Sequence, residues 1–158
     1  MGDFYTVSFT AVAITAVSDL FELKPGSTRP IRLHAIDLVQ TSDQATSESE
    51  TLRCTISRHG SGYTSGSGGT GTAAVVPVQS GGRAALFTAE TNNTTQASGG
   101  TPVVLQEFGW QVLSPGLWAP PVPPDQKPTA LSGEALVVKM NAPVDSITVS
   151  GTAWVEEL

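Results

Sequence analysis

Apolar and polar residues alternate along much of the chain with the two-residue period of β-strands. Near the N-terminus, Tyr5, Val7 and Phe9 fall on one face, and hydroxyl side chains occupy the positions between them. The alternation returns in Thr51–Arg58, where Cys54 lies on the apolar face. Such a pattern is typical of strands that bury one face. We therefore predict half-buried strands in both segments and interpret Cys54 as a small buried hydrophobe rather than a nucleophile.

Similar segments, separated by turn residues, recur along the chain. The further expected strands are 21–23, 31–41, 75–78, 86–90, 103–108, 110–113, 117–119, 135–140 and 146–155. The segments between them are rich in Gly, Pro, Asn and Ser, and none has convincing helical periodicity. About nine or ten short strands at this spacing predict an all-β antiparallel β-sandwich or jelly roll, in one domain spanning residues 1–158. The first and last segments are both good strands, so we expect them to be neighbours in a sheet.

Glycines and prolines mark the expected loops. Residues 59–72, HGSGYTSGSGGTGT, include six glycines and are expected to be mobile and solvated. A phosphate-binding loop would need the G-x-x-x-x-G-K-[ST] pattern, and this segment contains neither Lys nor Arg. Pro77 predicts an edge strand, and Pro120–Pro124, with four prolines in five residues, predicts a rigid loop. We expect a turn or bulge at Gly109.

The amino-acid composition also favours a fold without helices. Ser, Thr, Gly and Pro together form about two fifths of the 158 residues. Only 14% of residues are charged, against an average of about 25% in globular proteins. Turn formers and β-branched hydroxyl residues are poor helix formers. The composition therefore argues against a helical bundle, a coiled coil and the helix-rich α/β enzyme folds.

Charge and targeting signals narrow the expected partners. The net charge is −6, and the few Lys and Arg residues are spread along the chain, whereas nucleic-acid binders usually carry a basic patch. No segment approaches the roughly 18 consecutive apolar residues of a membrane span. The N-terminus lacks the basic and hydrophobic regions of a secretory signal. We expect no nucleic-acid or membrane partner, and synthesis in a reducing cytoplasm.

No group of residues indicates catalysis. His34 lies within an expected strand and His59 opens the glycine-rich segment, without the close spacing of paired metal ligands. Glu90, Glu107 and Glu134 are the acids of the strand regions and the candidates for the carboxylate pair of a glycoside hydrolase. Acids on separate strands are more often solvent-facing charges. The lone cysteine excludes a disulfide framework and a cysteine-based zinc site. We predict a protein that is not an enzyme and holds no cofactor or metal.

Asp37, Trp110, Trp118 and Trp154 are the candidate interface residues. Aromatic side chains form platforms for sugars and anchors of protein interfaces, and Trp118 adjoins the proline segment at an expected loop edge. Trp154 points outward if the face of Ala153 is the core, and it then needs a cover such as a second subunit. Packing of Trp154 against the other sheet is the alternative. Asp37 interrupts an apolar strand and would bind a partner's Arg or cap neighbouring backbone.

Several segments also carry a family resemblance. They are YTVSF at 5–9, DLFE at 19–22 followed by Pro25, LRCTISR at 52–58, the glycine-rich segment, FTAETNNTT at 87–95 and SGTAWVEEL at 150–158. Over most of its length the chain resembles small proteins encoded among the head and structural genes of tailed bacteriophages. The resemblance implies a virion structural role, in particular that of a β-rich, often trimeric capsid decoration (cement) protein on the outer capsid surface.

The expected function is therefore a phage capsid decoration protein that forms a homotrimer and binds the major capsid protein. A charge-poor strand surface rich in Thr and Ser suits permanent contacts, because few charges must be desolvated. Closed symmetry would let one surface patch serve several copies. Other functions stay open: a tail- or fibre-associated virion module, a carbohydrate-binding module that uses Trp110 or Trp118, and a glycoside hydrolase.

Overall fold

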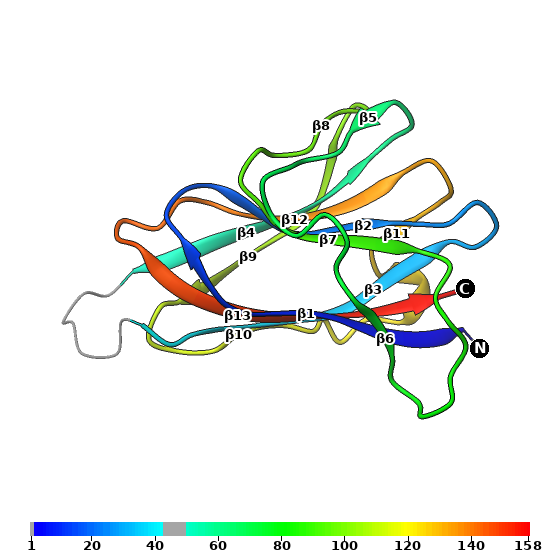
Figure 1. Cartoon of the computed structure of the whole chain (residues 1–158), viewed down its shortest axis with the longest axis horizontal. Helices are drawn as coiled ribbons and strands as arrows, with labels where there is room; N and C mark the ends of the chain where they lie inside the picture. The colour runs from blue at the N-terminus through cyan, green and yellow to red at the C-terminus, as the bar shows by residue number, and fades with distance from the viewer. Residues whose placement is uncertain (1, 43–49) are drawn as a thin grey trace.

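Strands make up nearly all the regular structure of the computed structural model, which describes residues 2–42 and 50–158 (Figure 1). The longer strands are β1 (Asp3–Ile14), β2 (Ser18–Lys24), β3 (Ile31–Gln40), β4 (Thr51–His59), β7 (Thr88–Asn93), β9 (Val103–Gln111), β12 (Ala135–Met140) and β13 (Ile147–Glu157). The shorter strands are β5 (Tyr63–Thr64), β6 (Val75–Pro77), β8 (Ser98–Gly99), β10 (Gly116–Trp118) and β11 (Thr129–Ala130). In these ranges the only helical element is a 3-10 turn, η1 (Pro124–Gln126). The predicted all-β class is confirmed.

The first sheet has the strand order β10-β3-β13-β1-β6, with β11 also paired to β3. The first and last strands of the sequence, β1 and β13, pair in antiparallel fashion from Asp3↔Glu157 to Ile14↔Ile147. This confirms that the two ends of the sequence are neighbours in a sheet. A β-bulge interrupts the pairing near Ala11, which has a φ of 52°.

The second sheet has the strand order β7-β2-β12-β4-β9, and all its pairs are antiparallel. The turn or bulge predicted at Gly109 is wrong, because Gly109 lies within β9 and pairs with Arg53 of β4. The register shift between these strands instead falls between Ile56 and Ser57. A continuous partner strand keeps Gly109 extended, and local sequence does not reveal that partner.

The pairing is nested along the chain. β1 pairs with β13, β2 with β12, β3 with β10 and β4 with β9. The first and third of these pairs lie in the first sheet, and the second and fourth lie in the second sheet. Successive strands of the first half therefore cross from one sheet to the other, which gives the two facing layers seen in Figure 1.

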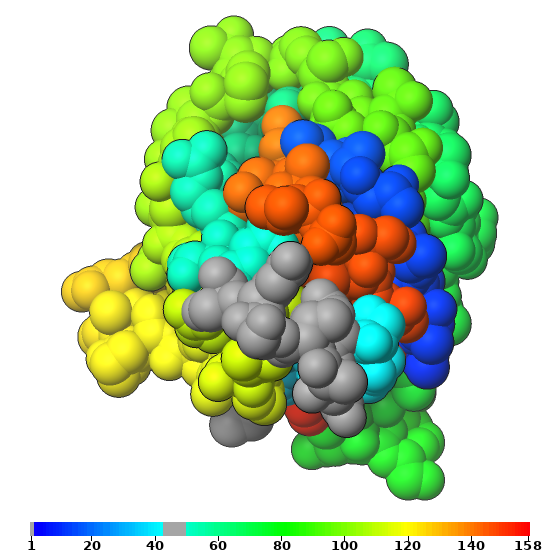
Figure 2. All heavy atoms as spheres, turned by 90° about the vertical axis from the view of Figure 1, so that its left-hand side faces the viewer, coloured from blue at the N-terminus to red at the C-terminus, as the bar shows by residue number. Residues whose placement is uncertain are grey.

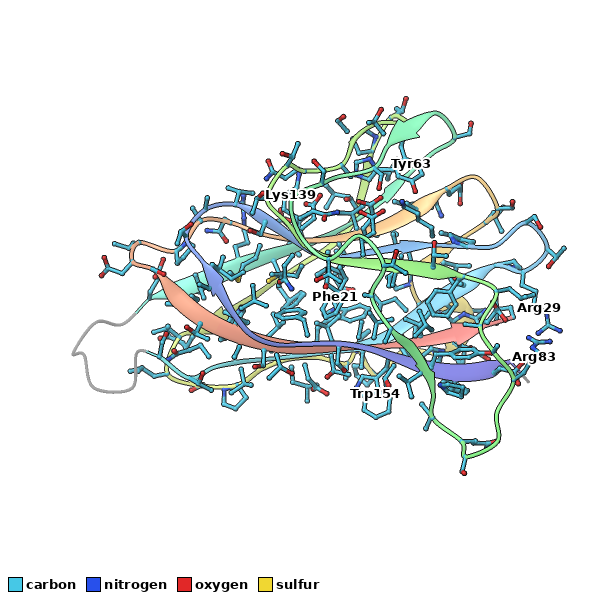
Figure 3. The ribbon with its side chains drawn as sticks, viewed as in Figure 1. Phe21, Arg29, Tyr63, Arg83, Lys139 and Trp154 are labelled. Carbon is cyan, nitrogen blue, oxygen red and sulfur yellow. The ribbon has the colours of Figure 1, made fainter. Side chains whose placement is uncertain are left out.

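The hydrophobic core lies between the two sheets, in a β-sandwich-like arrangement. Aromatic side chains from both layers meet there: the rings of Phe9 and Phe21 are 5.3 Å apart, and Figure 3 shows Phe21 between the layers. Cys54 is fully buried, as predicted. Gly151 leaves room for the ring of Phe9, whose Cε1 would lie 2.8 Å from a Cβ at that position. Burial of each such large side chain contributes about 1.5–3 kcal/mol of hydrophobic stabilisation.

The prolines lie in an edge strand and in a loop, as predicted. Pro77 ends β6, which is the edge strand beside β1. Pro120–Pro124 lies outside the strands and leads into η1. In the space-filling view, the yellow segment that includes η1 projects from one side of the molecule (Figure 2). A residue without a backbone N–H is tolerated at both places because no sheet hydrogen bond is lost.

The glycine-rich segment forms hydrogen-bonded structure rather than an irregular loop, and most of its residues are exposed, as predicted for a solvated segment. Residues 60–72 and 94–101, here called the cover, include β5 and β8, which pair with each other. The cover closes over the top of the molecule as viewed in Figures 1 and 2. The backbone N–H of Thr70 donates to the carbonyl of Thr91 at 2.8 Å, and the reverse bond is 3.1 Å long. A Cβ at Gly69 would clash with that same carbonyl oxygen, so glycine serves close packing here.

Candidate functional site

Apart from the cluster of Arg32, His34 and Glu156 at one end, the outer face of the first sheet is poor in charge and rich in hydroxyl and apolar side chains. Its hydroxyl side chains come from β1 and β13, and they are Thr6, Ser8, Thr10, Thr148, Ser150 and Thr152. Its exposed apolar side chains are Phe4, Val39, Val76, Leu117 and Trp154. Few charged groups would lose water if another surface covered this face.

Trp154 and Asp37 meet at the centre of this face. The Trp154 side chain is 36% exposed while Ala153 is fully buried, so the outward orientation is confirmed. Figure 3 shows Trp154 on the outer side of the first sheet. Its Nε1–H donates to Oδ2 of Asp37 at 3.1 Å. Thr152 lies opposite Asp37 in the β13–β3 register. Trp154, two residues further along β13, is therefore the diagonal neighbour of Asp37, and its side chain can reach the carboxylate.

A shallow groove of about 530 Å³ reaches Asp37, and Trp154 lies just outside its lining residues. Asp37, Val39 and Leu117 line one side, and hydroxyl side chains of β1 and β13 line the other. No Lys or Arg is among the lining residues. Within the described ranges no cation forms an ion pair with Asp37. The groove thus combines uncharged walls, apolar on one side and hydroxyl-bearing on the other, with one carboxylate that has no cationic partner in the described ranges.

Trp110 and Trp118 are core residues, which corrects the expectation of an exposed loop edge at Trp118. Their side chains are only 5% and 4% exposed. The ring of Trp118 stacks on Phe108 with centroids 6.3 Å apart, and Trp110 lies against Gly116, where a Cβ would come within 2.7 Å of its Cγ. β10 pairs with β3 so that Leu117 faces outward and the residues beside it face inward. Neither indole therefore offers a free face to a sugar or a protein.

His34 belongs to a polar cluster at one end of the outer face. Its Nε2 lies 2.8 Å from Oε2 of Glu156, which also accepts a bond from Arg32 at 3.1 Å. Nζ of Lys127 lies 3.3 Å from Nδ1 of His34. Burial alone would raise the pKa of Glu156, but bonds from His34, the Gly2 N–H and Arg32 outweigh it and lower that pKa. The cluster ties the two ends of the chain together, in keeping with a structural histidine.

His59 and Cys54 are likewise enclosed by the fold. Nδ1 of His59 lies 3.1 Å from the carbonyl oxygen of Gly99 in the cover, and the imidazole contacts the ring of Tyr63. Burial raises the pKa of the Cys54 thiol to about 12, against a smaller lowering by the neighbouring Trp110 indole. No group of three or more His, Cys, Asp or Glu side chains in the described part of the chain could hold a metal ion.

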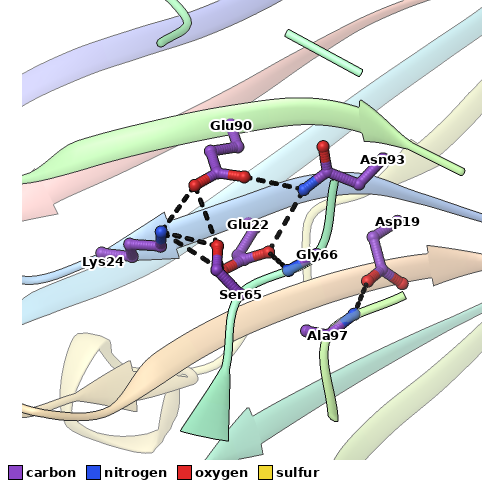
Figure 4. Close-up of polar contacts among 8 residues, drawn as sticks. All are labelled: Asp19, Glu22, Lys24, Ser65, Gly66, Glu90, Asn93 and Ala97. Carbon is purple, nitrogen blue, oxygen red and sulfur yellow. Dashed lines mark hydrogen bonds and ion pairs between the residues drawn. The ribbon is translucent and has the colours of Figure 1, made fainter. Parts of the chain in front are cut away.

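Glu22 is a fully buried carboxylate beneath the cover, and it is not among the candidate residues predicted from the sequence. Its Oε2 accepts the Gly66 backbone N–H at 2.9 Å and the Asn93 amide at 3.3 Å (Figure 4). The Ser65 hydroxyl lies 2.6 Å from its Oε1. Glu22 therefore fastens the cover to β2. The signal in the sequence was an acid between Phe21 and Leu23 of an apolar strand. Burial of a charge at such a position is costly unless the fold supplies hydrogen-bond partners.

Glu90 lies opposite Glu22 and shares its partners. Nζ of Lys24 lies 2.5 Å from Oε1 of Glu90 and 3.6 Å from Oε1 of Glu22. The Asn93 amide donates to Oε2 of Glu90 at 2.9 Å. Burial would raise the pKa of Glu90, but bonds from Lys24, Asn93 and Ser65 lower it overall. The cation offsets the repulsion expected between like charges that face each other across two strands.

Asp19 is the third buried acid under the cover. Its Oδ2 accepts the backbone N–H of Ala97 at 2.6 Å, while its Oδ1 has no hydrogen-bond partner. Burial raises the pKa of Asp19 and outweighs the opposing effects of Ala97 and Lys139. Of the acids considered for catalysis, only Glu90 on β7 joins this cluster. Glu107 is on β9, at the opposite edge of the second sheet, and Glu134 pairs with Arg58.

The described residues thus present two distinct polar sites, one open and one enclosed. The buried carboxylates are occupied by the cover, whereas the groove beside Trp154 and Asp37 is accessible from outside. Comparison of the chain with protein-family models, curated proteins and solved structures gave no match. The described part of the chain also contains no helix long and apolar enough to cross a membrane. The outer face with its groove is the candidate functional site.

Proposed function

We propose that this protein is a virion structural protein, a decoration (cement) protein that binds the outside of a tailed-phage head and stabilises it. The observation that carries the proposal is the outer face of the first sheet, on which Trp154 is exposed among small hydroxyl and apolar side chains. The sequence resemblance to small phage structural proteins points to the same role.

The composition of this face suits a lasting contact. Phe4, Val76 and Trp154 lie near one another on β1, β6 and β13, where Thr6 pairs with both Val76 and Trp154. Exposed apolar groups that lie together favour contact with another surface, because the contact removes apolar area from water. The hydroxyl side chains around them are less costly to desolvate than charges.

We also propose that the fold is a jelly roll. In such a fold a long antiparallel hairpin is rolled so that early and late strands pair in two facing sheets. The nested pairs β1–β13, β2–β12, β3–β10 and β4–β9, alternating between the sheets, support this assignment. Jelly rolls occur in viral capsid proteins and in lectins, so the fold supports the function by analogy alone.

The proposed assembly is a homotrimer on the capsid surface, with the major capsid protein as its partner. The protein would be made in the host cytoplasm and join the head there. A closed ring of copies would present the same face to the capsid from each protomer. A tail- or fibre-associated position is the second virion location to test, and a density map of the virion distinguishes it from the head surface.

Two measurements test the proposal. Size-exclusion chromatography with light scattering should give three times the 16.3 kDa chain mass, and the protein should sediment with heads of the phage that encodes it. Trp154→Ser should reduce sedimentation with heads at least tenfold. Val144→Ser, which changes an exposed apolar residue elsewhere, should not. A strictly monomeric protein that never binds heads would overturn the proposal.

A further inference from the structure

Asp37 is an exposed carboxylate that forms no ion pair with any cation of residues 2–42 and 50–158. The arginines are paired with acids of the same chain: Arg29 and Arg83 with Asp3, Arg32 with Glu156, Arg53 with Glu107 and Arg58 with Glu134. Two of the three lysines also lie near acids of the same chain, Lys24 beside Glu90 and Lys139 beside Asp19, and Lys127 lies 3.3 Å from Nδ1 of His34. The positive charge that would complement Asp37 therefore fits a different protein better than a second copy of this chain.

The surroundings of Asp37 suit a guanidinium group. The Trp154 Nε1–H occupies Oδ2 at 3.1 Å, and Oδ1 forms no hydrogen bond within the described ranges. An arginine side chain pairs with a carboxylate through directed N–H bonds and stacks on an aromatic ring. The indole and the carboxylate are in contact, so one incoming side chain would reach both.

The groove suits the rest of such a side chain. Val39 and Leu117 provide apolar walls, and Ser8 and Thr152, whose hydroxyls are 2.9 Å apart, provide a neutral floor. The aliphatic stem of an arginine packs on apolar surface while its head stays with polar groups. The absence of Lys and Arg from the lining residues leaves no like charge to repel it.

We propose that the groove beside Asp37 and Trp154 binds an arginine side chain presented by a different protein. The identity of that protein as a phage head protein rests on the proposed function, whereas the recognition of arginine does not. The interaction is a single ion pair with aromatic stacking, so an isolated peptide should bind weakly and in a salt-dependent way.

The test uses the full chain and two matched peptides, acetyl-Gly-Arg-Gly-amide and its citrulline counterpart, which has the same shape without the charge. The Trp154 Nε1–H signal in a ¹H–¹⁵N NMR spectrum reports on binding, and its assignment follows from its loss in Trp154→Phe. The arginine peptide should shift this signal in a saturable way, with an affinity about two- to fivefold above that of the citrulline peptide. Raising the NaCl concentration from about 0.05 M to about 0.5 M should weaken binding.

Variants locate the effect. Asp37→Asn keeps an acceptor for the indole but removes the charge, and it should abolish the preference for arginine. Asp125→Asn removes an equal charge from the exposed η1 turn and should leave binding unchanged. The spectra of both variants show whether the fold is retained, so a loss in Asp37→Asn alone is attributable to the groove.

Contrary outcomes are specific. Equal shifts with both peptides, or unchanged arginine binding in Asp37→Asn, would overturn the inference. So would a shift of the Trp154 signal by a neutral oligosaccharide but not by arginine, or a shift on concentrating the protein alone, which would indicate a second copy in the groove. Arginine binding by a protein that never joins heads refutes the proposed function but not this inference. Unchanged head binding by Asp37→Asn refutes the groove as the contact and leaves the proposed function intact.

Discussion

At the scale of single residues, burial changes the properties of charged and reactive side chains most strongly. Glu22 is fully buried and accepts bonds from two segments of the chain, whereas Glu107 is half exposed. Cys54 is buried with a raised pKa. These environments lead to two predictions about individual positions.

Glu22→Ala should lower the free energy of unfolding by about 3 kcal/mol, because it leaves the buried donors of Gly66 and Asn93 without an acceptor. Urea unfolding followed by tryptophan fluorescence measures the change. The control is Glu107→Ala, which removes an exposed acid and should change stability by less than about 0.5 kcal/mol. Equal effects of the two substitutions would contradict the role assigned to Glu22.

The Cys54 thiol should not react with a thiol-specific reagent at pH 8 in the folded protein. Its pKa is raised to about 12 by burial, so almost no thiolate is present. A disulfide reagent that releases a coloured product measures the reaction. The same reagent should modify one thiol per chain once urea unfolds the protein. Rapid modification under native conditions would show that the core around β4 opens readily.

At the scale of elements, the cover is held by backbone contacts that only glycine permits. Gly69 lies against the backbone of Thr91 and Asn92, while Gly71, two residues later, has open space around its Cα. The two glycines therefore differ in what a methyl group would meet. Strand β7 and the cover depend on this close approach, because Thr70 and Thr91 exchange both backbone bonds beside it.

Gly69→Ala should detach this part of the cover, while Gly71→Ala should not. The added methyl group at position 69 would clash with backbone atoms, and overpacking of this kind costs about 1–3 kcal/mol. Hydrogen exchange of the Thr70 and Thr91 amides measures local opening, and it should accelerate in Gly69→Ala alone. Similar exchange in both variants would show that the cover does not require glycine at this position.

At the scale of the whole molecule, ionisation couples stability to pH through groups on both sheets. Glu90 and Glu156 have lowered pKa values, so each stabilises the folded state above its ordinary value of 4.5. That stabilisation is lost as the pH falls through their folded-state pKa values. Asp19 has the opposite sign: its raised pKa makes the folded state bind a proton first as the pH falls toward 3.8.

The free energy of unfolding should therefore decrease as the pH falls below about 4.5. Glu90→Gln with Glu156→Gln should flatten this acid dependence. Asp19→Asn should steepen it just above pH 3.8, because it removes the compensating proton uptake. Urea unfolding at a series of pH values from 7 to 3 measures all three chains. A double variant with the same acid slope as the parent would contradict the assigned pKa shifts.

Much of the fold follows from short-range pattern. The alternation around Tyr5 and Cys54 predicts the strands and the buried faces, because side chains on a strand alternate with a period of two. The same pattern left two orientations for Trp154, either outward or packed against the other sheet. The burial of Trp110 and Trp118 was not predictable in this way, since it depends on β9 and β10 lying in different sheets and packing against each other.

The sequence by itself determined the all-β class, the positions of most of the longer strands and the adjacency of the first and last strands, since these depend on residues near one another or on the strand character of both ends. Only the tertiary structure decided that Asp37 meets Trp154, and that the cover encloses Glu22. Those contacts join residues 117 and 44 positions apart, respectively. They depend on strand order and register, which the packing of the whole chain selects and which no local pattern records.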